Sequence, residues 1–401
     1  QEYGYYSGGE SFTIADPNEI WIMEMIGKGP GVRGAVWVAV RVPDDCISAH
    51  ANQSRIHQFD MNDKNNCMYS PDVISFAREK GYFDGVNKDF SFANAYAPLD
   101  FGARRYCEAR VWSYFNMFTA RGNEFLPYIL GDTDTPMPLF VKPDRKISVQ
   151  DVKNAMRDHY EGTPLDISKD FGAGPYHTPY RLSPLSFKVG DKEYFNERPI
   201  STQQSGFVFV AQMRSTLPDA IGGVLWFGTD DANMTVFTPV YCCTDKVPVC
   251  YSRVDGADYI TFSWNSSFWI FNWVSNMVYP RYDLMIGDVR ATQNELETTF
   301  NEAQEGIESA AAKLLEKDPA KAKAFLTNYT NMTAQSAFDT WKRLGEFIIV
   351  KYNDGVVRKM KDGKFERNAI GQPAGVVRPG YPKEFLEEYV KQTGDRYKMP
   401  D

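Results

Sequence analysis

Short apolar runs separated by polar turns open the chain and predict a group of strands. Two runs, Ser11–Ala15 and Ile20–Met25, flank Asp16-Pro17-Asn18-Glu19, whose Asp, Pro and Asn favour a tight turn. A third run, Ala35–Val42, is almost entirely apolar, so we expect these strands to be covered on both faces. The polar cluster His50-Ala51-Asn52-Gln53 follows at the predicted sheet edge, and a functional site is expected there.

Helical signals dominate the next part of the chain. Apolar spacing predicts a short helix over Val73–Lys80 and a longer one over Arg104–Phe118. A capping box, Ser148 with Asp151 three residues later, predicts a helix that ends at Gly162. The Gly- and Pro-rich segment from Gly162 to Pro199 is typical of a loop that forms a pocket wall or lid.

A second set of buried strands is predicted at Phe207–Met213 and Gly223–Phe227, followed by an aromatic core helix or strand at Phe268–Val278. From Ala291 onward a long amphipathic helix is expected, stopped by Pro319. The elements expected after it are short helices around 320–326, 333–350 and 382–391, and a hairpin of 346–352 with 356–360 across Asn353-Asp354-Gly355. The pattern indicates a mixed α/β (α+β) class.

Charge and composition exclude several partners and cofactors. A net charge of −8 and a pI near 5.3 argue against nucleic acid or an anionic membrane surface. The 23 Tyr, 27 Phe and 8 Trp residues are instead compatible with an enclosed binding pocket. Four His residues and no CxxC pair make a metal site unexpected. Cys242 or Cys243 could pair with Cys250, or these thiols could stay free.

Several longer blocks carry a family resemblance. They are the stretch from Glu10 to Ile56 with SAHANQ, and then GARRYC (102–107), MRDHYEGTP (156–164), RPISTQQ (198–204), GGVLWFGTDD (222–231) and SFWIFNWVSN (267–276). In this order they resemble the cysteine dipeptidases (dipeptidase A type) of the N-terminal-nucleophile hydrolase superfamily, relatives of penicillin V acylase and choloylglycine hydrolase. The resemblance covers roughly residues 4 to 300. It implies a four-layer αββα sandwich over 1–290, with 291–401 as a helical extension packed on that core.

The resemblance also implies an acyl transfer in which a cysteine thiolate attacks an amide carbonyl and its own α-amine acts as the base. Asn52 resembles the oxyanion asparagine, although it could merely cap or turn the chain. Arg105, and Arg104 if the alignment slips by one, resemble an arginine near the nucleophile; a surface ion pair is the alternative for each. No metal or organic cofactor is implied.

Three further residues are weaker candidates for substrate binding. Asp230 and Asp231 could bind the free amine of a dipeptide, but acidic loop pairs are usually only solvated. His50 could line the site, although a hydrogen-bonded structural histidine is the commoner finding.

Enzymes of this type begin with the nucleophilic cysteine, whereas this sequence begins with Gln1. No cysteine in the chain follows a cleavage signal or heads a strand, so we expect the nucleophile on a missing or separate N-terminal piece of the same precursor. A truncated chain, the large fragment of a two-piece enzyme and a pseudoenzyme all remain open. Residues 1–401 alone are expected to leave sheet edges exposed.

The leading hypothesis is the larger portion of a bacterial, periplasmic or secreted cysteine hydrolase that cleaves dipeptides. One alternative is an amidase acting on conjugated bile acids or acylated amines. Another, of a different class, is a non-catalytic protein that binds a small molecule. The helical tail, 291–401, could also mediate homo-oligomer contacts.

Overall fold

The computed structural model describes residues 9–400, which form two compact units. The first unit consists of the chain up to Asp158 together with Ser183–Ile200 and Met213–Leu217. The second takes His159–Leu182, Ser201–Gln212 and the chain from Pro218 onward. The boundary predicted between 290 and 291 falls inside a helix of the second unit, and the division at that point stays a prediction.

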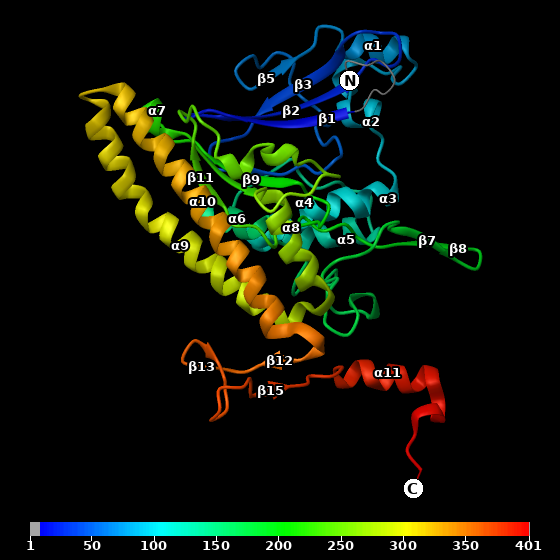
Figure 1. Ribbon diagram of the computed structural model, residues 1–401. Coiled ribbons are helices and arrows are strands. Elements are labelled where there is room, and N and C mark those ends of the chain that lie inside the picture. The colour runs from blue at the N-terminus through cyan, green and yellow to red at the C-terminus, as the bar shows by residue number, and fades with distance from the viewer. Residues whose placement is uncertain (1–8, 401) are drawn as a thin grey trace. The chain divides into compact units, whose positions relative to one another are not determined.

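A four-stranded antiparallel sheet forms the centre of the first unit (Figure 1). In pairing order its strands are β1 (Gly9–Ala15), β2 (Ile20–Gly27), β3 (Ala35–Arg41) and β5 (Cys67–Tyr69). The predicted turn between the first two strands is confirmed, because the Asp16 carboxylate accepts the backbone N–H groups of Asn18 and Glu19 at 2.6 and 2.9 Å. The three strands predicted from the apolar runs are confirmed as well.

Burial of this sheet is uneven. Val36 and Val38 of β3 are fully buried and pack in one core with Ile22 of β2 and with helix α1 (Val73–Glu79). The expectation that all the strands are covered on both faces is wrong for β1, where Ile14 is 51% exposed. The physical reason is that β1 is an edge strand, which among residues 9–400 pairs only with β2.

Short elements complete the first unit. The predicted helices at Val73–Lys80 and Arg104–Phe118 are confirmed, the second as a continuous run that contains a π-helical turn. The helices from residue 92 onward in this unit are α2 (Phe92–Tyr96), α3 (Phe101–Ala103), the π-helical turn (Arg104–Glu108), α4 (Ala109–Phe118), α5 (Leu126–Leu130) and α6 (Val149–Ala155). Two small strand pairs are β4 (Ile47–Ser48) with β6 (Phe140–Val141), and β7 (Ser186–Val189) with β8 (Lys192–Phe195). The second pair interrupts the segment predicted as a loop up to Pro199.

Helix α6 starts as predicted but ends early. The Ser148 hydroxyl accepts the Asp151 N–H at 3.1 Å, and the Asp151 carboxylate accepts the Ser148 N–H at 2.8 Å, so the capping box is confirmed. The predicted end at Gly162 is wrong, because the helix stops at Ala155. Tyr160 and Gly162 both take left-handed backbone conformations, with φ of 66° and 74°, which an α-helix cannot contain.

We expect Ser148→Ala to lower the free energy of unfolding by about 1 kcal/mol, because it removes the acceptor for an otherwise unpaired helix N–H. Ser148→Gly should lower the free energy of unfolding by only about a few tenths of a kcal/mol, since glycine exposes the same N–H to water. Urea unfolding of the three proteins measures the difference. Equal losses in both variants would contradict the assigned cap.

The second unit is built on a three-stranded antiparallel sheet in the order β11 (Thr238–Tyr241), β10 (Val224–Thr229) and β9 (Phe207–Gln212). Strands β9 and β10 are confirmed, whereas β11 was missed because Pro239 in its short run argues against a strand. Strand β9 is not fully buried as predicted. Its Phe207 and Phe209 are 59% and 50% exposed, because successive residues of an outer strand face opposite sides of the sheet.

The longest helices of this unit pack together: α8 (Ser267–Val278), α9 (Tyr282–Leu315) and α10 (Pro319–Tyr352). Helices α9 and α10 lie side by side as a long antiparallel pair (Figure 1). The aromatic run at Phe268–Val278 is therefore a helix, and its Phe271 ring stacks on Trp341 of α10 with centroids 4.7 Å apart. Helix α9 begins nine residues before the predicted start at Ala291, at Tyr282.

Helix α10 corrects two predictions. Pro319 stops α9 but also begins α10, where the Asp318 carboxylate caps the N–H groups of Ala320 and Lys321. The two short helices predicted around 320–326 and 333–350 are one continuous helix, and the hairpin with 346–352 does not form. The β-branched residues near its end stay helical because Ile348 is buried in the same apolar stripe as Trp341.

The last part of the chain is largely exposed. It contains the strand pairs β12 (Val357–Arg358) with β15 (Val376–Val377) and β13 (Met360–Lys361) with β14 (Lys364–Phe365), and helix α11 (Lys383–Thr393). Helix α11 confirms the prediction at 382–391. Cys242, Cys243 and Cys250 are all free thiols. Among residues 9–400, no helix is both long and apolar enough to cross a membrane.

Candidate functional site

A cavity of about 1080 Å³ opens in the first unit, beside β2 and the segment that follows β4. The segment Ala49–Ile56, called here the Asn52 loop, forms one wall, and helix α4 forms another. The polar and aromatic side chains that line the cavity include Glu10, Glu24, Lys28, His50, Asn52, Gln53, Tyr82, Tyr96, Arg110 and Tyr114. This volume is sufficient for a small organic substrate.

Asn52 is held in one orientation at the cavity wall. Its backbone is left-handed, with φ of 57°, a conformation that asparagine tolerates better than most residues. Arg110 Nη2 of α4 donates a hydrogen bond to Asn52 Oδ1 at 3.0 Å. The amide nitrogen makes no hydrogen bond to any other residue within 9–400. Asn52 therefore keeps a side-chain donor available for a ligand in the cavity.

His50 lies on the same wall and is tied to the first strand, with its Nε2 3.1 Å from the Thr13 hydroxyl. Burial, and then the charge of Arg55, lower the pKa of His50 below its ordinary value of 6.5. The imidazole is therefore neutral at pH 7. It can exchange hydrogen bonds with a ligand but brings no positive charge.

Two buried charged side chains, one from β2 and one from the loop itself, support the Asn52 loop. The Glu24 carboxylate of β2 accepts hydrogen bonds from the Ser54 hydroxyl and from the N–H groups of Arg55 and Ile56, the last two at 2.7 and 3.1 Å. The Arg55 guanidinium pairs with buried Glu108 at 3.0 Å. Burial raises the pKa of Glu24, while these hydrogen bonds oppose the rise.

Arg104 and Arg105 lie in the π-helical turn and do not line the cavity. Arg104 pairs with Asp134 at 2.9 Å, and Arg105 forms an ion pair with Glu197. Their predicted catalytic role stays a prediction, although both have the protein partners expected of the structural alternative. Sequence reasoning missed Arg110, whose contact with Asn52 joins residues 58 positions apart and leaves no local signal.

We expect Arg110→Met to lower kcat more than Arg105→Met does in an active preparation. Loss of the hydrogen bond to Asn52 Oδ1 frees the amide to rotate, and one charge-assisted hydrogen bond corresponds to about a tenfold change. Steady-state kinetics of the two variants make the comparison. A larger loss of kcat for Arg105→Met would instead support the predicted catalytic role of Arg105.

Asp230 and Asp231 lie in the second unit, at the end of β10, and both are fully buried. The Asp230 carboxylate accepts hydrogen bonds from Asn272 Nδ2 and from the Ser275 hydroxyl, each at 2.9 Å. Asp231 accepts the Tyr279 hydroxyl at 3.1 Å. Burial, and then the neighbouring carboxylate, raise the pKa of Asp230. These contacts are structural ones, and the predicted binding of a substrate amine stays a prediction.

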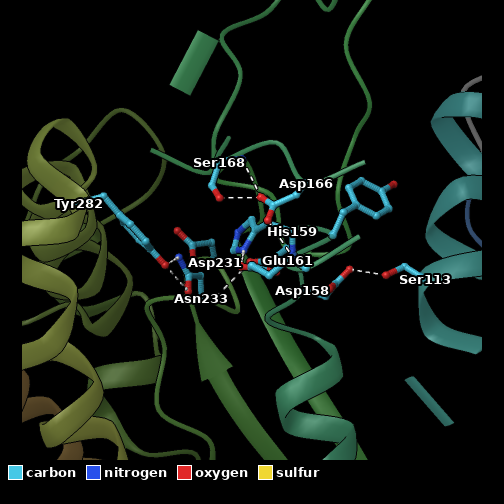
Figure 2. A network of polar contacts seen from close by, with 12 residues as sticks. Ser113, Asp158, His159, Glu161, Asp166, Ser168, Asp231, Asn233 and Tyr282 are labelled. Carbon is cyan, nitrogen blue, oxygen red and sulfur yellow. Dashed lines mark hydrogen bonds and ion pairs between the residues drawn. The ribbon is translucent and has the colours of Figure 1, made fainter. Parts of the chain in front are cut away.

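A polar network surrounds Asp231 (Figure 2). His159 Nδ1 lies 2.9 Å from the Glu161 carboxylate. Burial raises the pKa of Asp231, although the hydrogen bond from the Met234 N–H opposes the rise. Asn233 donates to the Tyr282 hydroxyl at 3.2 Å. The motif GTDD at the end of a strand signalled acidic residues, but only the fold shows that they are enclosed.

Neither a metal site nor an activated thiol is found in the part of the chain that the structure describes. Over residues 9–400, no three His, Cys, Asp or Glu side chains gather in an arrangement that could hold a metal ion. None of the six cysteines lines the cavity. Burial raises the pKa of Cys107, the cysteine nearest in sequence to Arg110, so its thiol is protonated at neutral pH.

The family model "Peptidase family C69" matches residues 1–295, about three quarters of the chain. The chain belongs to peptidase family C69. This C69 chain is 34% identical over 235 residues to a probable dipeptidase of Salmonella dublin, covering 58% of the chain and 47% of that relative. It is 30% identical over 224 residues to a probable dipeptidase of Latilactobacillus sakei, covering 55% of the chain and 40% of the relative.

A third relative, probable dipeptidase B of Lactococcus lactis, is 26% identical over 360 residues, covering 87% of the chain and 66% of the relative. The C69 chain thus spans about half the length of the first two relatives it matches. Membership of a peptidase family and the names of these relatives agree with the hydrolase predicted from the sequence blocks. The mixed helix and sheet architecture agrees with the predicted α/β class.

Proposed function

We propose that this C69 chain is the larger part of a cysteine N-terminal-nucleophile hydrolase that cleaves dipeptides. The observation that carries the proposal is the cavity wall where Arg110 fixes the amide oxygen of Asn52 and leaves its nitrogen as a donor. Family membership supplies the reaction class. The proposed core is the four-layer αββα sandwich typical of that superfamily.

In the proposed reaction a cysteine thiolate attacks the carbonyl carbon of the dipeptide. The α-amine of that cysteine takes the thiol proton and later delivers it to the leaving amine. Negative charge develops on the carbonyl oxygen, and Asn52 Nδ2 donates a hydrogen bond to it. Water then attacks the thioester, which releases the first amino acid and restores the thiol.

The charges around the cavity suit a zwitterion. Lys28 and Arg110 bring positive charge to the wall, whereas Glu10 on exposed β1 brings negative charge. Lys28 Nζ also forms an ion pair with Asp72 Oδ2 at 2.5 Å, and Arg110 Nη2 also donates a hydrogen bond to Asn52 Oδ1. A dipeptide carries a free amine and a free carboxylate a few ångströms apart, so groups of both signs can bind it in one direction.

The nucleophile in this proposal comes from polypeptide outside residues 9–400, because no cysteine among the described residues lines the cavity. We propose that a piece of the same precursor that begins with the nucleophilic cysteine supplies it. Intact-mass analysis and N-terminal sequencing of the purified protein under denaturing conditions identify such a piece.

Activity tests the proposal directly. The whole preparation should hydrolyse members of a dipeptide panel, and prior alkylation with iodoacetamide should abolish the hydrolysis. A glycine-conjugated bile acid in the same assay separates the dipeptidase from an amidase of the bile-acid type. Absence of thiol-dependent hydrolysis on the panel, with a second polypeptide present, would contradict the proposal.

A further inference from the structure

The Asn52 loop has an unusual support, because its own backbone does not pair with a neighbouring strand. Within residues 49–56 no strand is formed, yet the loop carries the side chain that faces the cavity. Side chains therefore supply much of its support. Two of them are nearly fully buried: Glu24 of β2, which is 1% exposed, and Arg55 within the loop, which is 4% exposed.

Glu24 holds the C-terminal end of the loop. Its carboxylate projects from the buried side of β2 and accepts three donors at once: the Ser54 hydroxyl and the backbone N–H groups of Arg55 and Ile56. A carboxylate can accept this many donors. An amide of the same shape has only one oxygen, and its NH₂ group would face the backbone N–H groups, donor against donor. Both carboxylate oxygens are therefore needed as acceptors at this position.

Arg55 ties the C-terminal end of the loop to its start. Its guanidinium donates to the Ala49 carbonyl at 2.9 Å and to the Pro138 carbonyl at 3.0 Å, while Nε pairs with Glu108 of the π-helical turn. One side chain thus closes the loop from residue 49 to residue 55. Arginine has donors directed along several edges of one plane, which a lysine does not offer.

We propose that Glu24 and Arg55 are positioning residues, which hold the two ends of the Asn52 loop from inside the protein so that Asn52 faces the cavity in one orientation. The inference rests on the proposed function for the reaction that Asn52 assists. The hold on the loop is a separate property of the fold. Glu24 lies at the cavity wall, but its carboxylate oxygens are engaged by the loop rather than available to a substrate.

The proposal predicts non-additive kinetics. Glu24→Gln should lower kcat by about tenfold or more with little change in KM, since a displaced donor is lost mainly in the transition state. In an Asn52→Gly background the same substitution should cost less than about twofold further, because the residue through which it acts is already gone. Glu19→Gln, which removes an exposed ion-pair partner of Arg41, is the matched control and should leave kcat unchanged.

Hydrogen exchange tests the hold on the loop without relying on activity. In the whole preparation, Glu24→Gln should speed exchange at the Arg55 and Ile56 amides by about tenfold or more and leave the β2–β3 ladder unchanged. Ser54→Ala, which removes only the hydroxyl donor, should give a smaller acceleration of exchange. It replaces Glu24→Gln in this test if Glu24→Gln does not fold. Arg55→Lys should loosen the loop in the same way, whereas Arg41→Lys should not.

Two results would overturn the proposal: unchanged exchange at Arg55 and Ile56 in Glu24→Gln, or an equal kcat loss with and without the Asn52 side chain. An inactive wild-type preparation would instead overturn the proposed function. The exchange data would still decide whether Glu24 and Arg55 hold the loop.

Discussion

Replacing Asn52 with glycine is expected to lower kcat by about 10²- to 10³-fold with little change in KM. Loss of one oxyanion donor typically has this effect, because the hydrogen bond strengthens only as charge develops on the carbonyl oxygen. Glycine is the suitable replacement, since Asn52 has φ of 57° and alanine would add backbone strain to the loss of the donor. Steady-state kinetics on the best dipeptide of the panel provide the measurement.

Gln53→Ala is the matched control for this variant. Gln53 lies in the same loop, and its Nε2 donates to the Ala97 carbonyl at 2.6 Å, so its removal perturbs the loop without removing the proposed donor. We expect a much smaller loss of kcat for Gln53→Ala. Similar losses in the two variants would show that the loop tolerates no change and would remove the support for Asn52 as the oxyanion donor.

Local chemistry made some elements predictable from the sequence. The Asp16 turn, the Ser148 capping box and the apolar run of β3 were predicted because each is decided by neighbouring residues. Helix α10 was divided wrongly, since its β-branched end is held helical by packing against residues far away in the chain. The same long-range packing decides which strands are outer ones, so the prediction that the strands are covered on both faces was wrong for β1.

The residues of the candidate site likewise fall into those that could be predicted from the sequence and those that could not. The polar cluster at His50 and Asn52 could be located because it follows an apolar run, and the structure places both on one cavity wall. Arg110 and Glu24 could not be found, because their contacts with the Asn52 loop span 58 and about 30 residues. Sequence pattern gives the position of a loop, whereas the side chains that orient it come from elements that meet only after folding.

The buried acid pair predicts a stability that depends on pH in an unusual direction. Burial and the neighbouring Asp231 carboxylate raise the pKa of Asp230 from 3.8 to about 8, so the folded state keeps a proton that the unfolded chain releases. The unfolded state then binds fewer protons between these two values, and stability falls as pH rises through this window. The slope contributed by one retained proton is about 1.4 kcal/mol per pH unit.

Asp230→Asn isolates this contribution. Asparagine has the same shape, tolerates the left-handed φ of 69° at this position and carries no titrating group. Urea unfolding of wild type and variant from pH 5 to pH 8 should show wild type losing stability relative to the variant as pH rises, because wild type must keep the Asp230 proton in place and the variant has no proton to keep at this position. A difference that is constant with pH, or that grows in favour of wild type toward pH 8, would mean that Asp230 is ionised in the folded protein and that Asn272 and Ser275 outweigh the cost of its burial.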